Sequence, residues 1–237
     1  MESRVVILGR GNVATALYNG LETAGVDVIQ LWHRGVCLCA DADIYVISVS
    51  DDAVHEVACL CPPNALVVHT AGSVGMDVIP HKRRGVIYPM QSFTKGRRVD
   101  WSRVPFFIES ECDNDYIVLE KLVHCLSSVS YRLSSERRCT LHLAAVWVSN
   151  FTNHMWTIAS ELLSQEDLSF SIMLPLIEET AAKVHDMSPR QAQTGPARRG
   201  DISVLEAHEA MLSEELRLIY RLISRSIYDD TIRPYTH

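Results

Sequence analysis

The stretch Val5-Val-Ile-Leu-Gly-Arg-Gly-Asn-Val-Ala14 decides the fold, because an apolar run leads into a glycine-rich turn that opens an expected helix. In such a G-x-G-x-x-G/A motif the first glycine permits a tight turn, the second lets a diphosphate approach, and the last position needs a small residue. The helix N-terminus adds partial positive charge. The expected contacts are Gly9, Arg10, Gly11, Asn12 and Val13. The alternative is a turn that only reverses the chain.

Strand-like and helix-like segments alternate after this turn. Several strand-like segments are unbroken runs of Val, Ile and Leu, as in strands that helices cover on both faces. The predicted strands are Arg4–Leu8, Val26–Leu31, Asp43–Val49, Ala65–Thr70, Gly85–Tyr88, Pro105–Glu109 and Ser130–Leu133. The predicted helices are Val13–Ala24, Asp52–Leu60 and Asp115–Ser127. The alternation predicts an α/β fold with a doubly wound, mostly parallel sheet of the Rossmann type.

One interval departs from that alternation. Between Arg34 and Asp43 there are too few residues for a helical crossover, which takes about a dozen or more. An extended linker still reaches, at roughly 3.3–3.6 Å per residue. We therefore expect the usual second helix and third strand to be absent or vestigial.

The strand pattern stops after Ser134, and helical patterns follow. Ser135–Leu163 and Leu174–Val184 are predicted helices, and Ser188-Pro-Arg-Gln191 has the form of a capping box. Asp201 is expected to cap a further helix from Ile202 to about Ile227. The sequence therefore predicts a dinucleotide-binding domain over residues 1–134 and an all-helical domain over residues 135–237.

Composition narrows the class of protein. The chain has 237 residues, 47% of them hydrophobic and 22% charged, which is typical of a globular protein with a sizeable core. A net charge of −7 argues against a nucleic-acid-binding protein. We find no pattern of a signal peptide or membrane span, and expect a cytoplasmic protein without membrane partners. The C-x-C cysteine pairs lack the spacing of zinc sites, so no metal is expected.

The end of the second predicted strand selects the cofactor. NAD-binding proteins carry an acidic residue there for the ribose 2′-hydroxyl, whereas this chain has His33 and Arg34. A guanidinium suits a 2′-phosphate. We therefore predict NADP(H) as the cofactor, with a solvated surface arginine as the alternative.

Small and polar residues follow three predicted strands, at the edge of the sheet where ligands bind. We expect Ser50 and Asp51 to flank the nicotinamide ribose. Residues expected near the nicotinamide ring are His69, Thr70, Gly72 and Ser73, and those expected near the substrate are Tyr88 and Gln91. The alternative is that Asp51 or Asp52 caps the next helix and that Gly72 only fills a turn.

A polar stripe marks the long helix after Ser134. His142, Ser149 and Asn153 fall within about 40° of one another on a helical projection, and Asn150 lies nearby. Buried polar side chains need partners, so the stripe predicts one wall of a cleft, with internal hydrogen bonding as the alternative.

Further along the chain, a loop carries a second group of polar residues. Thr194 and Arg198 fit an anion site there, or the arginine is simply solvated. The basic runs Lys82-Arg-Arg84 and Arg137-Arg138 are interpreted as solvated surface.

These motifs together resemble a known family. They are Gly9–Ala14, Asp51-Asp52, His69–Ser73, Tyr88–Phe93, His142–His154, Gln193–Asp201 and His208. The chain resembles Rossmann-like proteins with a C-terminal helical domain of unknown function of the DUF2520 type. These are related to pyrroline-5-carboxylate reductase, deazaflavin-dependent NADP reductase and the 6-phosphogluconate and β-hydroxyacid dehydrogenases. The resemblance implies a helical domain of the 6-phosphogluconate dehydrogenase type, an NADP-dependent oxidoreductase, and a homodimer formed through that domain.

The expected reaction is hydride transfer between NADPH and a small carbonyl or imine, in a cleft between the two domains. His142 is predicted to donate a proton or a hydrogen bond to the substrate, with Asn150 and Asn153 orienting the substrate and Arg198 holding a carboxylate. No lysine lies between Ser135 and Leu163, unlike the catalytic helix of the β-hydroxyacid dehydrogenases. The alternative is a dinucleotide-binding regulator without turnover.

Overall fold

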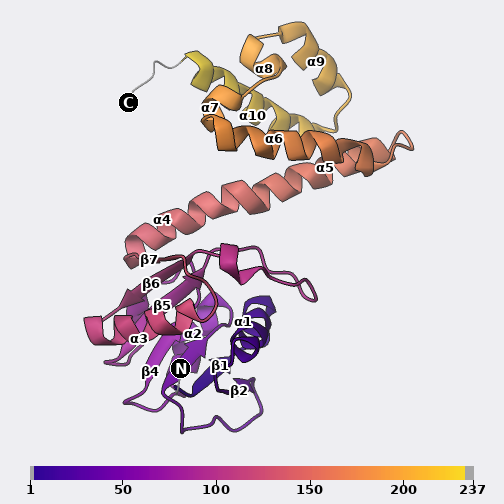
Figure 1. The fold of residues 1–237 in the computed structure, drawn as a ribbon. Helices are drawn as coiled ribbons and strands as arrows, with labels where there is room; N and C mark the ends of the chain where they lie inside the picture. The colour runs from indigo at the N-terminus through magenta and orange to yellow at the C-terminus, as the bar shows by residue number, and fades with distance from the viewer. Residues whose placement is uncertain (1–2, 233–237) are drawn as a thin grey trace. The chain divides into compact units, whose positions relative to one another are not determined.

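The computed structural model describes residues 3–232, and the chain divides into two compact units, Met1–Thr157 and Ile158–His237 (Figure 1). The division falls inside helix α5 (Thr152–Ser164). It lies beyond Ser134, where the sequence pattern places the domain boundary, because the helix after the last strand is hydrogen-bonded to the sheet and its loops. None of the helices in the described residues is long and apolar enough to cross a membrane.

The first unit contains a seven-stranded sheet in the order β2-β1-β3-β4-β5-β6-β7 (Figure 1). The strands are β1 (Val5–Leu8), β2 (Val28–Trp32), β3 (Ile44–Ile47), β4 (Leu66–His69), β5 (Arg84–Pro89), β6 (Phe106–Ser110) and β7 (Ser130–Arg132). Neighbouring strands are parallel except for the antiparallel pair β5 and β6. The predicted mostly parallel sheet is confirmed, with strand ends shifted by a residue or two.

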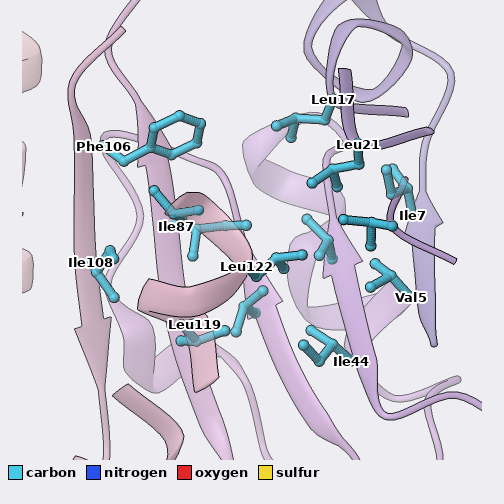
Figure 2. Packing of buried hydrophobic residues seen from close by; sticks show 14 of the residues in the cluster. Val5, Ile7, Leu17, Leu21, Ile44, Ile87, Phe106, Ile108, Leu119 and Leu122 are labelled. Carbon is cyan, nitrogen blue, oxygen red and sulfur yellow. The ribbon is translucent and has the colours of Figure 1, made fainter. Parts of the chain in front are cut away.

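Helices cover both faces of the sheet because β1 sends alternate side chains to opposite sides. Val5 and Ile7 pack with α1 (Asn12–Thr23) and α3 (Asp113–His124), as Figure 2 shows. Val6 and Leu8 pack with α2 (Val54–Ala58), which follows a short 3₁₀ turn (Asp51–Ala53). As predicted, neither helix nor strand occurs between β2 and β3, and the linker that joins them begins with a turn over residues 33–36.

The long helix predicted after Ser134 is continuous but not uniform. It comprises α4 (Ser135–Ala145), a π-helical turn (Val146–Phe151) and α5. A π turn holds one residue more than an α turn and often marks a functional site. The sequence pattern contains no indication of this turn.

The second unit is helical, as predicted. It contains a 3₁₀ turn (Phe170–Met173), α6 (Leu174–Asp186), α7 (Pro189–Ala192), α8 (Pro196–Arg199), α9 (Ile202–Ala210) and α10 (Glu214–Ile232). The capping box between Ser188 and Gln191 is confirmed.

The single helix predicted from Ile202 to about Ile227 is wrong, because the chain breaks after Ala210 and begins again at Glu214. The hydroxyl of Ser213 accepts the N–H of Leu216 at the new start. Asp201 occupies the predicted N-cap position of α9, but its carboxylate makes no capping hydrogen bond and accepts one from Arg199 instead.

Candidate functional site

A cavity of about 940 Å³ opens at the carboxyl edge of the sheet in the first unit. Loops after β1, β3, β4 and β5 form one side, and α4 with the π turn forms the other. The cavity is lined by these predicted site residues: Gly9, Arg10, Gly11, Asn12, Val13, Ser50, Asp51, Thr70, Gly72, Tyr88, Gln91, His142 and Asn150. The structure thus brings together residues from five separate segments of the sequence.

The two glycines of the first turn, Gly9 and Gly11, are needed for different reasons. Gly9 has φ +136°, and a Cβ there would lie 2.0 Å from the carbonyl oxygen of Ser48, so the fold itself requires glycine. Gly11 has an ordinary φ of −71°, and a Cβ there would meet no protein atom within 4 Å. Since the fold does not explain Gly11, its lack of a side chain points to a ligand that approaches this backbone closely.

The N-terminus of α1 is free to bind an anion. Within the described part of the chain no side chain caps it, and its first turn carries no acidic residue. The side-chain amide of Asn12 donates to the carbonyl of Phe93 at 3.0 Å, which holds the loop after β5 beside the turn. The turn and helix start over Gly9–Val13, called the cradle below, therefore combine the uncapped N–H groups of α1 with a fixed neighbouring loop.

His33 and Arg34 line an adjoining cavity of about 340 Å³ that shares Gly9, Arg10 and Ser50 with the larger one. The Arg34 guanidinium lies 3.1 Å from the carboxylate of Glu56, and both side chains are well exposed. An exposed pair of this kind is weak, so a phosphate can compete for the arginine. Its position is compatible with the predicted contact to a 2′-phosphate.

His69 and Ser73 lie outside the lining, contrary to the predicted direct contacts. The His69 ring is fully buried, with Nδ1 accepting the N–H of Ala71 at 3.1 Å and Nε2 donating to the carbonyl of Gly75 at 3.3 Å. Burial, with help from the Arg138 charge, lowers the pKa of His69 to about 4. Ser73 donates to the carboxylate of Asp51. Both residues shape the loops that line the cavity.

His142 stands between the loops after β4 and β5. Its Nδ1 lies 3.1 Å from the hydroxyl of Tyr88, and the two rings meet edge-on. A Cβ on Gly72 would lie 2.5 Å from the same nitrogen, so glycine is needed for the imidazole to fit. Burial raises the pKa of Tyr88, which keeps the phenol protonated, and its hydroxyl can donate to Nδ1 or accept a hydrogen bond from it.

The π turn changes which polar residues face the cavity. Ser149 and Asn150 line it, whereas Asn153 is exposed outside the lining. One extra residue in the turn rotates everything beyond it by about 100°, which moves Asn153 off the face of His142 and brings Asn150 toward it. Of the three residues of the predicted stripe, His142 and Ser149 therefore line the cavity and Asn153 does not.

Sequence reasoning missed an ion pair between Arg138 and Glu109 that supports the site. Arg138, interpreted as solvated, is 1% exposed and forms an ion pair with Glu109. Its guanidinium also donates to the carbonyl of Val74 and, at 3.1 Å, to the hydroxyl of Ser135. This network fixes α4 one turn before His142. Local pattern cannot reveal it, since the partners lie on separate strands, loops and helices.

The interpretation of the other basic run, Lys82-Arg-Arg84, as solvated surface is also partly wrong. Arg83 is bonded to the buried carboxylate of Asp115 at 2.6 Å, and Arg84 pairs with Glu111 at 2.7 Å. Each of these pairs joins β5 or its approach to the segment that begins α3.

Thr194 and Arg198 belong to the second unit and are not among the residues that line the cavity. Arg198 donates to the carbonyls of Gln191 and Gln193, so its guanidinium closes its own loop. Their predicted substrate contacts stay predictions. Among residues 3–232, no group of three or more His, Cys, Asp or Glu side chains is placed to hold a metal ion.

Comparison with known proteins agrees with this architecture. A family model described as a domain of unknown function, DUF2520, matches residues 104–227. No curated protein matches the chain. A protein from Bacteroides fragilis that is provisionally assigned as an NADP oxidoreductase is 38% identical, and the match covers 96% of this chain and 98% of that one with a TM-score of 0.89.

Two more distant structures share the fold. A reductive aminase from Aspergillus terreus, in complex with NADPH and ethyl levulinate, is 15% identical over 97% of this chain and 95% of its own, with a TM-score of 0.73. A pyrroline carboxylate reductase from Plasmodium falciparum, with NADP bound, is 11% identical over 97% and 98%, with a TM-score of 0.57. Both resemble this chain in its Rossmann sheet and its helical region.

Proposed function

This chain belongs to the DUF2520 family, and from that premise we propose that it is an NADP(H)-dependent oxidoreductase acting on a small carbonyl or imine compound. The observation that carries the proposal is Gly11, a glycine with ordinary backbone angles whose missing side chain leaves the diphosphate cradle open. The relatives solved with NADPH and NADP support the same cofactor class.

The residues present fit the dinucleotide from end to end. Gly9–Val13 would hold the diphosphate, and Arg34 the 2′-phosphate, with His33 beside it. Ser50, Asp51, Thr70 and Gly72 would lie beside the nicotinamide ribose and ring. When bound, the reduced nicotinamide supplies a hydride to the carbon of a C=O or C=N group.

His142 would supply the matching proton. In its doubly protonated form the ring would donate its Nδ1–H to the Tyr88 oxygen and pass its Nε2 proton to the oxygen or nitrogen of the reduced bond, which leaves a neutral imidazole. Tyr88 would thus hold the ring as well as border the substrate. Asn150 and Gln91 line the same cavity and would orient the substrate.

Ligand binding tests the cofactor proposal. NADPH should raise the melting temperature, and NADH and S-adenosylmethionine should raise it little. Gly11→Ala should leave the melting temperature of the free protein unchanged while weakening NADPH binding roughly tenfold or more, because a methyl group enters the cradle. Full NADPH affinity in Gly11→Ala would contradict the proposal that the diphosphate binds against Gly11.

A matched pair of variants tests the 2′-phosphate contact. Arg34→Gln should weaken NADPH binding roughly tenfold and leave NADH binding unchanged. Glu56→Gln, which frees the same arginine, should bind NADPH at least as well as the wild type. An equal response to both cofactors in the wild type would contradict the choice of NADP(H).

Turnover separates the enzyme from a regulator. Ketones and imines are screened for loss of the reduced-nicotinamide absorbance, and His142→Asn should lower kcat by roughly a hundredfold or more. NADPH binding without turnover across the panel would favour the non-catalytic, dinucleotide-responsive alternative.

We also propose that two copies of the chain associate through the helical unit. Leu176 of α6 and Leu222 of α10 are 62% and 70% exposed, and Met211, directly after α9, is 79% exposed. Exposed apolar faces of this kind are typical of interaction surfaces. Sedimentation equilibrium would measure the association, and a monomer at micromolar concentration would contradict it.

A further inference from the structure

A second cavity, of about 490 Å³, lies along the side of α1 and belongs to no step of the proposed reaction. Residues Thr94–Arg98, in the segment after β5, form one wall, and the exposed side of α1 forms the other. Arg10 and Asn12 border both this cavity and the larger one. Its volume falls within the range of small-molecule sites.

The walls of this second cavity carry positive charge without a counterion. Lys95, Arg97, Arg98 and Arg10 line it and are exposed, and no acidic residue is among its lining residues. Within residues 3–232, none of these four cations forms an ion pair, whereas the chain as a whole has a net charge of −7. An electropositive cavity on an acidic protein selects anions.

The segment that presents these cations is anchored at both ends. Phe93 accepts the hydrogen bond from Asn12 and packs on Trp101, with ring centroids 5.7 Å apart. Trp101 stacks on Phe106 and lies against α1, where a Cβ on Gly20 would meet its indole nitrogen at 2.4 Å. The aromatic anchors fix the two ends of the segment, so the cations between them stay beside α1.

The backbone between the anchors turns toward the cavity. The N–H of Arg97 donates to the carbonyl of Thr94 at 3.1 Å, and Gly96 has φ +79°, which favours glycine. Opposite this turn, Thr15 and Asn19 of α1 offer a hydroxyl and an amide. Cations on one wall and neutral hydrogen-bonding groups on the other are what a multiply charged anion needs.

We propose that this cavity, formed by the 94–101 segment and α1, binds a small polyanion carrying several phosphate or carboxylate groups. The ligand binds Lys95, Arg97 and Arg98, and reaches Arg10 at the border with the larger cavity. Because Arg10 serves both cavities, occupancy of this one changes affinity at the diphosphate turn. The proposal does not depend on the reaction or on the identity of the cofactor.

Hydrogen exchange on the full chain tests the proposal, with tripolyphosphate and citrate as separate probes for the phosphate and carboxylate classes. Saturable protection of the amides of residues 94–99 by at least one probe is the expected result. The peptide over residues 9–14 reports binding at the diphosphate turn in the same experiment. The experiment therefore distinguishes a lack of binding at the proposed cofactor site from a lack of binding in this cavity.

A charge-matched pair of triple variants gives the second readout. Lys95→Ala/Arg97→Ala/Arg98→Ala should weaken the protection midpoint roughly tenfold or more and flatten its salt dependence. Lys82→Ala/Lys121→Ala/Arg137→Ala removes three exposed cations elsewhere and should change the midpoint less than about twofold. Protection confined to residues 9–14, no protection with either probe, or equal midpoints in the two variants would each overturn the proposal. Protection by an acidic polypeptide alone would also overturn it, since that is a protein-docking surface.

Discussion

The two units of this chain bury their apolar side chains to very different extents. The sheet unit holds two clusters of hydrophobic residues, one on each face, with most members fully buried. In the described chain, Ala197 is the only buried hydrophobic residue after Val123. In the helical unit, Met211 and Leu222 are 79% and 70% exposed.

This difference shows where the stability of each unit comes from. The core of the sheet unit is complete within the chain, so its stability should depend little on protein concentration. The helices of the second unit keep apolar faces that another surface must cover. If that surface is a second copy of the chain, the stability of the helical unit rises with concentration.

The largest expected difference between the units is in the free energy of unfolding that each loses when an ion pair is broken. Arg138 is buried against Glu109 in the sheet unit, whereas Arg221 pairs with Glu209 in the helical unit with 58% of its side chain exposed. Arg138→Ala leaves a shielded carboxylate unpaired and should lower the free energy of unfolding by about 3–5 kcal/mol. Arg221→Ala should lower it by less than about 1 kcal/mol.

Urea unfolding at one protein concentration measures both variants. The double variant Arg138→Leu/Glu109→Gln removes the unpaired charge and should recover part of the loss. Losses of equal size in the two single variants would show that the burial of Arg138 does not make its pair stronger.

The sheet unit was predictable because its patterns are local and its strands are covered on both faces. Val5–Leu8 predicts a buried strand by composition, and Gly9 and Gly11 mark the turn that follows. The absent crossover between β2 and β3 follows from simple counting of residues. Arg138 was not predictable, since a buried pair depends on partners brought together only by folding.

The cavity was predictable on the side formed by strand-end loops and less so on the side formed by the helix. Tyr88, Gly72 and His142 follow from the topology and the resemblance. Asn153 leaves the face of His142 because a π turn intervenes, and no residue pattern announces that turn. His69 was assigned to the ligand because its bonds to the backbone are invisible in the sequence.

Two leucines give the next contrast. Leu66 is fully buried in β4, whereas Leu222 of α10 is 70% exposed. Leu66→Ala should lower the free energy of unfolding by about 2–5 kcal/mol at every protein concentration, because it opens a cavity in a packed core. Leu222→Ala should cost less than about 0.5 kcal/mol in the dilute monomer and weaken self-association. Chemical unfolding and sedimentation equilibrium, each across a concentration series, separate the two effects.

Those leucines also test the self-association proposal directly. A Leu222→Ala protein with unchanged association would show that this part of α10 lies outside the interface. A concentration-dependent cost at Leu66 would contradict the claim that the sheet unit is complete within one chain.

His69 makes the stability of the sheet unit depend on pH. Burial lowers its pKa from 6.5 to about 4, so between these values the unfolded chain takes up a proton that the folded chain does not. Stability is therefore undiminished above pH 6.5 and falls as the pH drops toward 4, by about 3 kcal/mol in all. Urea midpoints at several pH values measure this loss.

A neutral substitute isolates the histidine from the carboxylates that titrate in the same range. His69→Gln keeps an acceptor and a donor for Ala71 and Gly75, and its stability should fall less than that of the wild type between pH 6.5 and 4. His154→Gln controls for the loss of a surface histidine. Parallel profiles for wild type and His69→Gln would mean that the ring does not carry this effect.

The smallest contrast concerns local order within the helical unit. The hydroxyl of Ser188 accepts the N–H of Gln191, whose side chain accepts the N–H of Ser188 in return. Ser188→Ala removes half of this box and should cost about 1 kcal/mol.

Hydrogen exchange of the amides in α7 is the direct readout for Ser188→Ala, and it should speed up roughly fivefold. Ser188→Asn, which supplies another capping oxygen, should restore most of the protection. The acceleration should be the same at all protein concentrations, because the box lies within one chain, whereas the effect of Leu222→Ala on the helical unit should shrink on dilution. If both effects shrink on dilution, α7 is itself ordered by association, and the helical unit has even less structure of its own than its exposed leucines indicate.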